Sequence, residues 1–171
     1  MGQIAMEYSE QNLEMLRNRL SQQDVKIRLD SVTALAEFAA IEKVVDDLIA
    51  ILDNKAEKWF IRIQAIKSLN KSKSRKAIGA IFAVVNDEEA IVGSEARLAI
   101  GNLAANNEPL LIEALLEALG NDKNRFWAAD TLGYYSKANL VQQALMDKVN
   151  KGNANEREAA AFALGYFKGE P

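Results

Sequence analysis

Residues 124–135 read "NRFWAADTLGYY", a helical segment with counterparts elsewhere in the chain. When Leu132 is taken as the reference, equivalent leucines recur at separations of 34, 34, 29 and 32 residues. These leucines are Leu35, Leu69, Leu103, Leu132 and Leu164. A period of roughly 20 to 50 residues is the sequence signature of stacked repeats. The segment is therefore predicted to be one helix of a repeated unit.

A second amphipathic segment precedes each leucine-bearing segment, so every unit is predicted to be a pair of helices. In these preceding segments apolar residues recur three and four positions apart, which is the period of a helix with one buried face. Short polar turns such as "ND" and "GND" separate the two helices of a unit. The chain contains only two prolines and lacks the alternation of β-branched residues that is typical of strands.

Two further columns keep the same register as the leucines. Small residues stand four positions earlier: Ser31, Ala65, Ala99, Ala128 and Ala160. The residues seven positions earlier are Arg28, Arg62, Ala96, Arg125 and Arg157. Small side chains let neighbouring helices approach closely while the leucines fill the space between layers. We expect the arginines to brace adjacent units.

These patterns predict a single all-α domain over residues 1–171. Its five units are expected at approximately 10–40, 41–73, 74–107, 108–136 and 137–169. One helix pair cannot bury its own apolar face, so stacking of pairs has to supply the core. The expected architecture is an α-solenoid, a superhelix of about five helix pairs.

The pattern R-x-x-A-x-x-x-L-G occurs as "RFWAADTLG" at residues 125–133 and as "REAAAFALG" at 157–165. It resembles the HEAT-like repeats first described in phycobilisome lyase subunits. The resemblance extends over nearly the whole chain and is clearest in the fourth and fifth units. It implies a HEAT-like solenoid and does not by itself fix a function, because one fold hosts many functions.

Composition excludes several classes of chemistry. Cysteine and histidine are both absent, which removes disulfides, the usual zinc ligands, thiol nucleophiles and the side chain best suited to proton transfer at neutral pH. We expect no catalytic residue, no metal site and no cofactor. The longest apolar runs fall short of the roughly 20 residues that a membrane helix needs, so the expected protein is soluble and cytoplasmic with no membrane partner.

Aromatic residues concentrate near the carboxyl end, where seven of the 12 lie between residues 126 and 167. Aromatic side chains are enriched among interface hot spots. Positions two and five before the repeat leucine are expected to form an exposed second-helix face. The partner-binding candidates from this region are Trp127, Asp130, Tyr134, Phe162 and Tyr166. Phe126, Tyr135 and Phe167 are instead expected to be buried.

The segment from Lys55 to Lys76 carries eight lysines and arginines against one acid, Glu57, a local charge of +7 in a chain of net charge −3. Residues 70–76, "NKSKSRK", are expected to be the loop between the second and third units, for which a solvated connector is the commonest role. The functional alternative is a docking patch for an acidic protein surface or for phosphate backbones. The candidate residues are Lys67, Lys71, Lys73, Arg75 and Lys76. The acidic balance of the whole chain argues against nucleic acid as the partner.

Three functions remain open from the sequence. The leading hypothesis is a non-enzymatic scaffold or adaptor that binds another protein on the face of the second helices. The resemblance implies an alternative, a subunit of a phycobiliprotein (bilin) lyase or a pigment-protein chaperone. It would hold the bilin or the phycobiliprotein against Trp127, Asp130 and Phe162 and act beside a second repeat subunit. Nucleic-acid binding through residues 55–76 is the third. The ends of a short solenoid are also candidates for pairing in a homodimer.

Overall fold

The computed structural model describes residues 2–72, 74–105, 109–135 and 139–165. Every regular element in these ranges is a helix, in agreement with the predicted all-α class. The helices are α1 (Gly2–Arg19), α2 (Val25–Leu35), a 3-10 turn (Ala36–Phe38), α3 (Glu42–Asp53), α4 (Trp59–Ser72), α5 (Arg75–Ala83), α6 (Ala90–Ala105), α7 (Pro109–Ala118), α8 (Arg125–Tyr135), α9 (Asn139–Lys151) and α10 (Ala154–Gly165). The first of them begins at Gly2, ahead of residue 10, where the first unit was expected to start.

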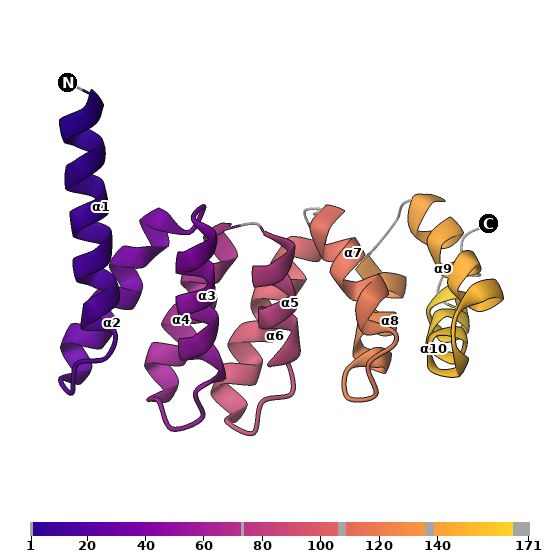
Figure 1. Cartoon of the computed structure of the whole chain (residues 1–171). Helices are drawn as coiled ribbons and strands as arrows, with labels where there is room; N and C mark the ends of the chain where they lie inside the picture. The colour runs from indigo at the N-terminus through magenta and orange to yellow at the C-terminus, as the bar shows by residue number, and fades with distance from the viewer. Residues whose placement is uncertain (1, 73, 106–108, 136–138, 166–171) are drawn as a thin grey trace.

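The helices form consecutive hairpins stacked in a row, with the two ends of the chain at opposite ends of the row (Figure 1). The second helices α2, α4, α6, α8 and α10 each contact the next in order, and they make up one layer. In the other layer α3, α5, α7 and α9 contact one another in order, while α1 packs on α2. This two-layer stack is the α-solenoid that the repeat period predicts.

The repeat leucines form much of the core between the layers. Leu35, Leu69 and Leu132 are fully buried, Leu103 is 8% exposed, and Leu164 in the last helix is only half-buried. All five residues of the small column are buried as well. The predicted spine is therefore confirmed, and it loosens at α10, where no following helix pair in the described residues covers it.

Polar side chains in the turns cap the amino ends of α2 and α5. The Asp24 carboxylate accepts hydrogen bonds from the backbone N–H groups of Lys26 and Ile27 at the start of α2. Ser74 Oγ accepts from the N–H of Ala77 at the start of α5. These caps satisfy backbone donors that a helix leaves unpaired at its amino end.

Buried and partly buried arginines link adjacent helix pairs near the amino end of the stack. Arg28 Nε and Nη2 donate to the two carboxylate oxygens of Glu57, at 2.8 and 2.9 Å, and so join α2 to the turn before α4. Arg62 repeats the arrangement one unit later, donating to both oxygens of Asp87 at 3.0 and 2.7 Å and to the backbone oxygen of Leu52 at 2.7 Å. The predicted arginine brace is confirmed at these two positions. Arg17 makes a comparable pair with Asp47 and fastens α1 to α3.

The brace changes where the arginine column is interrupted by Ala96. Arg97, the next residue, donates to Val85 O within its own unit. Here the third and fourth pairs are joined by amides instead, since Asn86 Nδ2 donates to Asn124 Oδ1 at 3.2 Å and Asn124 Nδ2 donates to Phe82 O at 3.5 Å. In the fourth unit Arg125 pairs with Asp122 of its own turn and lies 3.6 Å from Glu158 of α10.

Asp87 provides a test of the brace, because its side chain is 1% exposed and that of Arg62 is 3% exposed. Replacing Asp87 by Asn leaves the guanidinium buried without its counter-charge, and we expect a loss of about 3 kcal/mol in the free energy of unfolding. Asp46→Asn is the control, since Asp46 and its partner Lys76 are each about half exposed and solvent screening leaves such pairs with little effect on stability. Urea titration followed by circular dichroism measures both.

The same carboxylate predicts a pH dependence. The Arg62 guanidinium holds the pKa of Asp87 far below its usual range, and Lys55 and the N–H of Glu89 act in the same direction. A carboxylate whose pKa is lowered by folding stabilises the fold fully above its unfolded pKa, which is roughly 4 for aspartate. That contribution declines below this pH and is lost as the pH falls through the folded-state pKa. Urea titrations at several acidic pH values should therefore show a decline in wild type that is smaller in Asp87→Asn.

Candidate protein-interaction surface

Exposed large apolar side chains collect on the second helices. Each second helix carries at least one in the described residues: Ile27 on α2, Trp59 on α4, Ile91 and Leu98 on α6, Phe126 on α8 and Phe162 on α10. In the other layer the corresponding residues are Met15 on α1, Ile41 before α3 and Met146 on α9. Exposed apolar groups that extend over several neighbouring elements are typical of interaction surfaces.

An aromatic pair joins the last two second helices on this surface. The rings of Phe126 and Phe162 lie 6.0 Å apart between centroids at an interplanar angle of 82°, which is an edge-to-face contact. The Arg125 guanidinium lies 4.8 Å from the centroid of the Phe126 ring, a favourable cation–π distance. Phe126 remains 45% exposed and Phe162 48% exposed. The two rings together form an exposed apolar area with the Arg125 guanidinium beside it.

The burial predicted from the sequence is reversed for two neighbouring residues. Phe126 was expected to be buried and is exposed, while Trp127 was expected to be exposed and is half-buried against Phe82 of α5, with ring centroids 5.6 Å apart. Successive residues of a helix point about 100° apart, and only one of the two can face the inner aromatic ring. The burial of Trp127 follows from that neighbour, which belongs to another unit and is invisible to the repeat pattern.

Of the two columns expected to form the exposed face, the one two positions before the leucine is the exposed one. Thr33, Lys67, Asp130 and Phe162 are exposed in it, with Gly101 half-buried. The column five positions before the leucine is mixed, since Ala159 is fully buried and Gln64 half-buried. Asp130 therefore lies on the surface one turn beyond Phe126. The side chains of Tyr134 and Tyr135 lie outside the described part of the chain, as do Tyr166 and Phe167.

The cations of the basic stretch are paired with acids from other parts of the chain. Lys71 pairs with Glu37 at 2.9 Å, Lys67 lies 3.9 Å from Glu95, and Lys55 pairs with Asp87. Arg75 pairs with Glu117 of α7, and Lys76 pairs with Asp46 of α3. These acids raise the pKa values of the Arg75 and Lys76 side chains. Much of the local positive charge is thus paired with acids distant in sequence, and docking through Lys67, Lys71, Arg75 and Lys76 stays a prediction. Lys73 lies outside the described residues.

No group of three or more carboxylates in the described residues is placed to hold a metal ion. None of the helices described there has the length and apolar character needed to cross a bilayer.

The observed burial of Trp127 and exposure of Phe126 can be tested by measuring the stability of alanine variants. Trp127→Ala removes a ring packed on the core, and we expect it to lower the free energy of unfolding by roughly 2–3 kcal/mol. Phe126→Ala removes a ring that is nearly half in solvent, with an expected loss of about 1 kcal/mol or less. Thermal and urea unfolding measure both variants, and equal losses would contradict the assignment.

Comparison with known proteins places this geometry in a family. A sequence model described as HEAT repeats matches residues 13–101, which is more than half of the chain. No curated protein matches the chain in sequence. Among solved structures it is similar to the complex of CpcE and CpcF of phycocyanin lyase from Nostoc sp. PCC7120, with 20% identity and a TM-score of 0.49. That match covers 93% of this chain and 66% of the other, slightly under two thirds of its length.

Two other structures show the same kind of likeness. A designed armadillo repeat protein in complex with the peptide (KR)4 has 21% identity and a TM-score of 0.47, with 97% of this chain and 86% of that chain covered. Human deoxyhypusine hydroxylase in complex with glycerol has 16% identity and a TM-score of 0.41, with 94% and 75% covered. Such distant similarities concern the fold alone. With stacked helix pairs throughout the described residues and the family match over 13–101, the chain belongs to the HEAT repeat family.

Proposed function

We propose that this protein is a non-enzymatic scaffold that holds another protein on the layer of its second helices. The observation that carries the proposal is that every second helix from α2 to α10 carries at least one exposed large apolar side chain. Stacked helix pairs offer an extended surface to a partner, and aromatic anchors supply much of the affinity at such surfaces. The Phe126–Phe162 pair is the best placed anchor, because its rings already support each other and lose little freedom on binding.

The remaining candidate residues extend this surface in two directions. Asp130 lies one turn from Phe126 and offers a carboxylate beside the aromatic pair. Lys67 and Lys71 of α4 lie toward the amino end and are each more than half exposed. We assign to Tyr134 and Tyr166 the same partner-binding role, at the carboxyl end. A second repeat subunit or a second copy of this chain is a candidate partner for the same surface.

Site-specific photo-crosslinking tests the proposal. A benzophenone amino acid placed at position 126 or 162 should crosslink to another protein in extracts of the native cells. The same amino acid at position 146, where Met146 is 51% exposed on α9, should give little product. Equal crosslinking at 146, or none at 126 and 162, contradicts the assignment of the surface.

The aromatic pair also predicts a loss of affinity. Phe126→Glu or Phe162→Glu should weaken capture of the crosslinked partner by roughly thirty-fold, the equivalent of a hot-spot loss of about 2 kcal/mol. Met146→Glu is the matched control, since it places the same charge on an exposed apolar position of the other layer. Quantitative mass spectrometry of affinity-purified complexes measures the loss, and circular dichroism confirms that each variant is folded.

Pigment handling as a bilin lyase subunit is the second candidate, and one observation favours it. The exposed Phe126 and Phe162 rings lie against each other on neighbouring helices, and a flat conjugated pigment can stack on such an aromatic surface. Titration with phycocyanobilin followed by visible absorption tests this function. A new band that disappears in Phe162→Ala would support it, and an unchanged spectrum would exclude it.

A further inference from the structure

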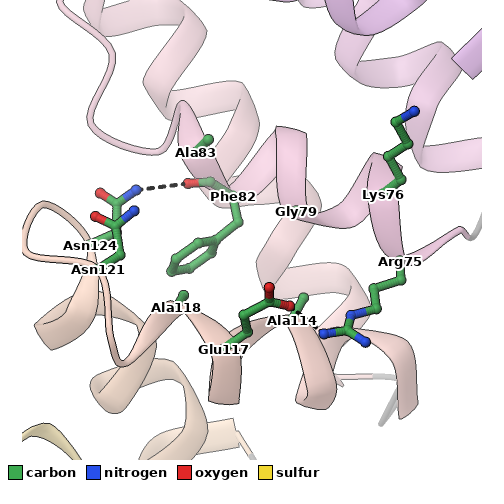
Figure 2. Close-up of a pocket in the computed structure, with 10 residues that line it drawn as sticks. All are labelled: Arg75, Lys76, Gly79, Phe82, Ala83, Ala114, Glu117, Ala118, Asn121 and Asn124. Atoms are coloured by element: carbon green, nitrogen blue, oxygen red, sulfur yellow. Dashed lines mark hydrogen bonds and ion pairs between the residues drawn. The ribbon is translucent and has the colours of Figure 1, made fainter. Parts of the chain in front are cut away.

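Polar side chains cross every junction between successive helix pairs in the described residues. In order along the stack, the groups that meet are Arg28 with Glu57, Arg62 with Asp87, Asn124 with Phe82 O (Figure 2) and Asn155 with Asp122. Each helix pair is therefore held to the next by a hydrogen-bonded contact as well as by the apolar core. At the first two junctions this contact has two halves, an arginine on one pair and a carboxylate on the pair that follows.

Arg157 presents the arginine half of this contact at the carboxyl end of the stack. Arg28 Nη1 donates to the backbone oxygen of Gln23, five residues earlier, at 2.8 Å, while its Nε and Nη2 hold Glu57 of the next pair. Arg157 Nη1 likewise donates to the backbone oxygen of Gly152, five residues earlier, at 2.9 Å. Arg157 is exposed, and no carboxylate in the described residues pairs with it. Its guanidinium is thus anchored as that of Arg28 is, without the acid of a following pair.

Asp24 presents the carboxylate half at the amino end. Glu57 Oε1 accepts from the N–H of Lys58, and Asp87 Oδ1 accepts from the N–H of Glu89, so both acids of the first two junctions also bond to the backbone beside the second helix of their own pair. Asp24 Oδ1 accepts from two N–H groups at the start of α2 in the same way. Asp24 is exposed, and no lysine or arginine in the described residues forms an ion pair with it.

The apolar core is also incompletely covered at both ends of the stack. Leu164 is half-buried, whereas Leu132, the equivalent residue one pair earlier, is fully buried. Leu16 and Leu20 of α1 contact the core and are likewise half-buried. Contact between the two ends would remove apolar surface from water together with forming the ion pair.

We propose that copies of this chain associate head to tail, so that the last helix pair of one copy lies against the first helix pair of the next and the stack continues. Arg157 of one copy donates through Nε and Nη2 to the Asp24 carboxylate of the other, as Arg28 does to Glu57 within the chain. The occupant is a second copy because the two ends carry the complementary halves of one contact. Such a contact joins two different surfaces, so it builds open chains of copies unless the rotation between them closes a ring.

Sedimentation velocity over a range of protein concentrations tests the proposal. We expect the average mass of the wild type to rise with concentration beyond that of one chain. Arg157→Ala and Asp24→Asn should each raise the Kd for self-association about ten-fold, because each removes one side of the ion pair. Asparagine caps a helix about as well as aspartate, so Asp24→Asn keeps the start of α2 intact.

Two further variants serve as matched controls. Lys123→Ala and Asp53→Asn remove the same charges from exposed positions at other turns, where no ion pair to either residue occurs in the described residues. Both should associate as the wild type does. Circular dichroism confirms that every variant is folded.

Mixing the two end variants distinguishes a head-to-tail contact from a symmetric one. Arg157→Ala keeps an intact amino end and Asp24→Asn keeps an intact carboxyl end. At concentrations where neither variant associates alone, the mixture should therefore form one-to-one dimers, and these should not grow further because both outer ends are altered. A symmetric contact uses the same patch on both copies, so the mixture would not restore it.

The proposal is overturned if the wild type keeps the mass of one chain at the highest soluble concentration. It is equally overturned if either end variant associates as strongly as the wild type, or if their mixture stays monomeric. These outcomes are distinct from failure of the scaffold function. Phe126→Glu alters the second-helix surface and should leave self-association unchanged, while crosslinking from position 126 to another protein should proceed normally in Asp24→Asn.

Discussion

Burial of apolar side chains between neighbouring helix pairs is the constraint on which the rest of this structure depends. A single pair has one apolar face and nothing to cover it, so each unit is stable only against the next. The leucine and small-residue columns meet this requirement with two simple devices, a side chain that fills the layer and a side chain that lets helices approach. Because these columns point into the core, they leave the outward surfaces of both layers free to vary.

That division explains what the sequence could and could not predict. The repeat leucines and the arginines at Arg28 and Arg62 were found because they recur in register, and recurrence within one chain is visible without coordinates. The burial of the Trp127 side chain was missed because its partner Phe82 lies in another unit and outside any repeat column. Pairing of Lys71 and Arg75 with Glu37 and Glu117 was missed for the same reason, since these acids stand far away in sequence.

The family match and the sequence motif emphasise different halves of the chain. The R-x-x-A-x-x-x-L-G pattern is clearest after residue 124, whereas the HEAT repeat match covers residues 13–101. Both halves nevertheless build the same two layers. Surface chemistry diverges between them, with paired charges on α4 and α5 and exposed aromatic rings on α8 and α10. A scaffold of this type can thus carry different binding surfaces along one continuous frame.

Because the arginine column is interrupted at Ala96, adjacent helix pairs in the stack are joined by two different kinds of side-chain contact. The first two are fastened by bidentate ion pairs, Arg28 with Glu57 and Arg62 with Asp87, whereas the third combines the neutral amides of Asn86 and Asn124 with the exposed Arg75–Glu117 pair. Amides do not titrate, so acid weakens the ion pairs at all three junctions and leaves the amide hydrogen bonds of the third in place. The third junction therefore keeps a side-chain connection in strong acid that the first two lose.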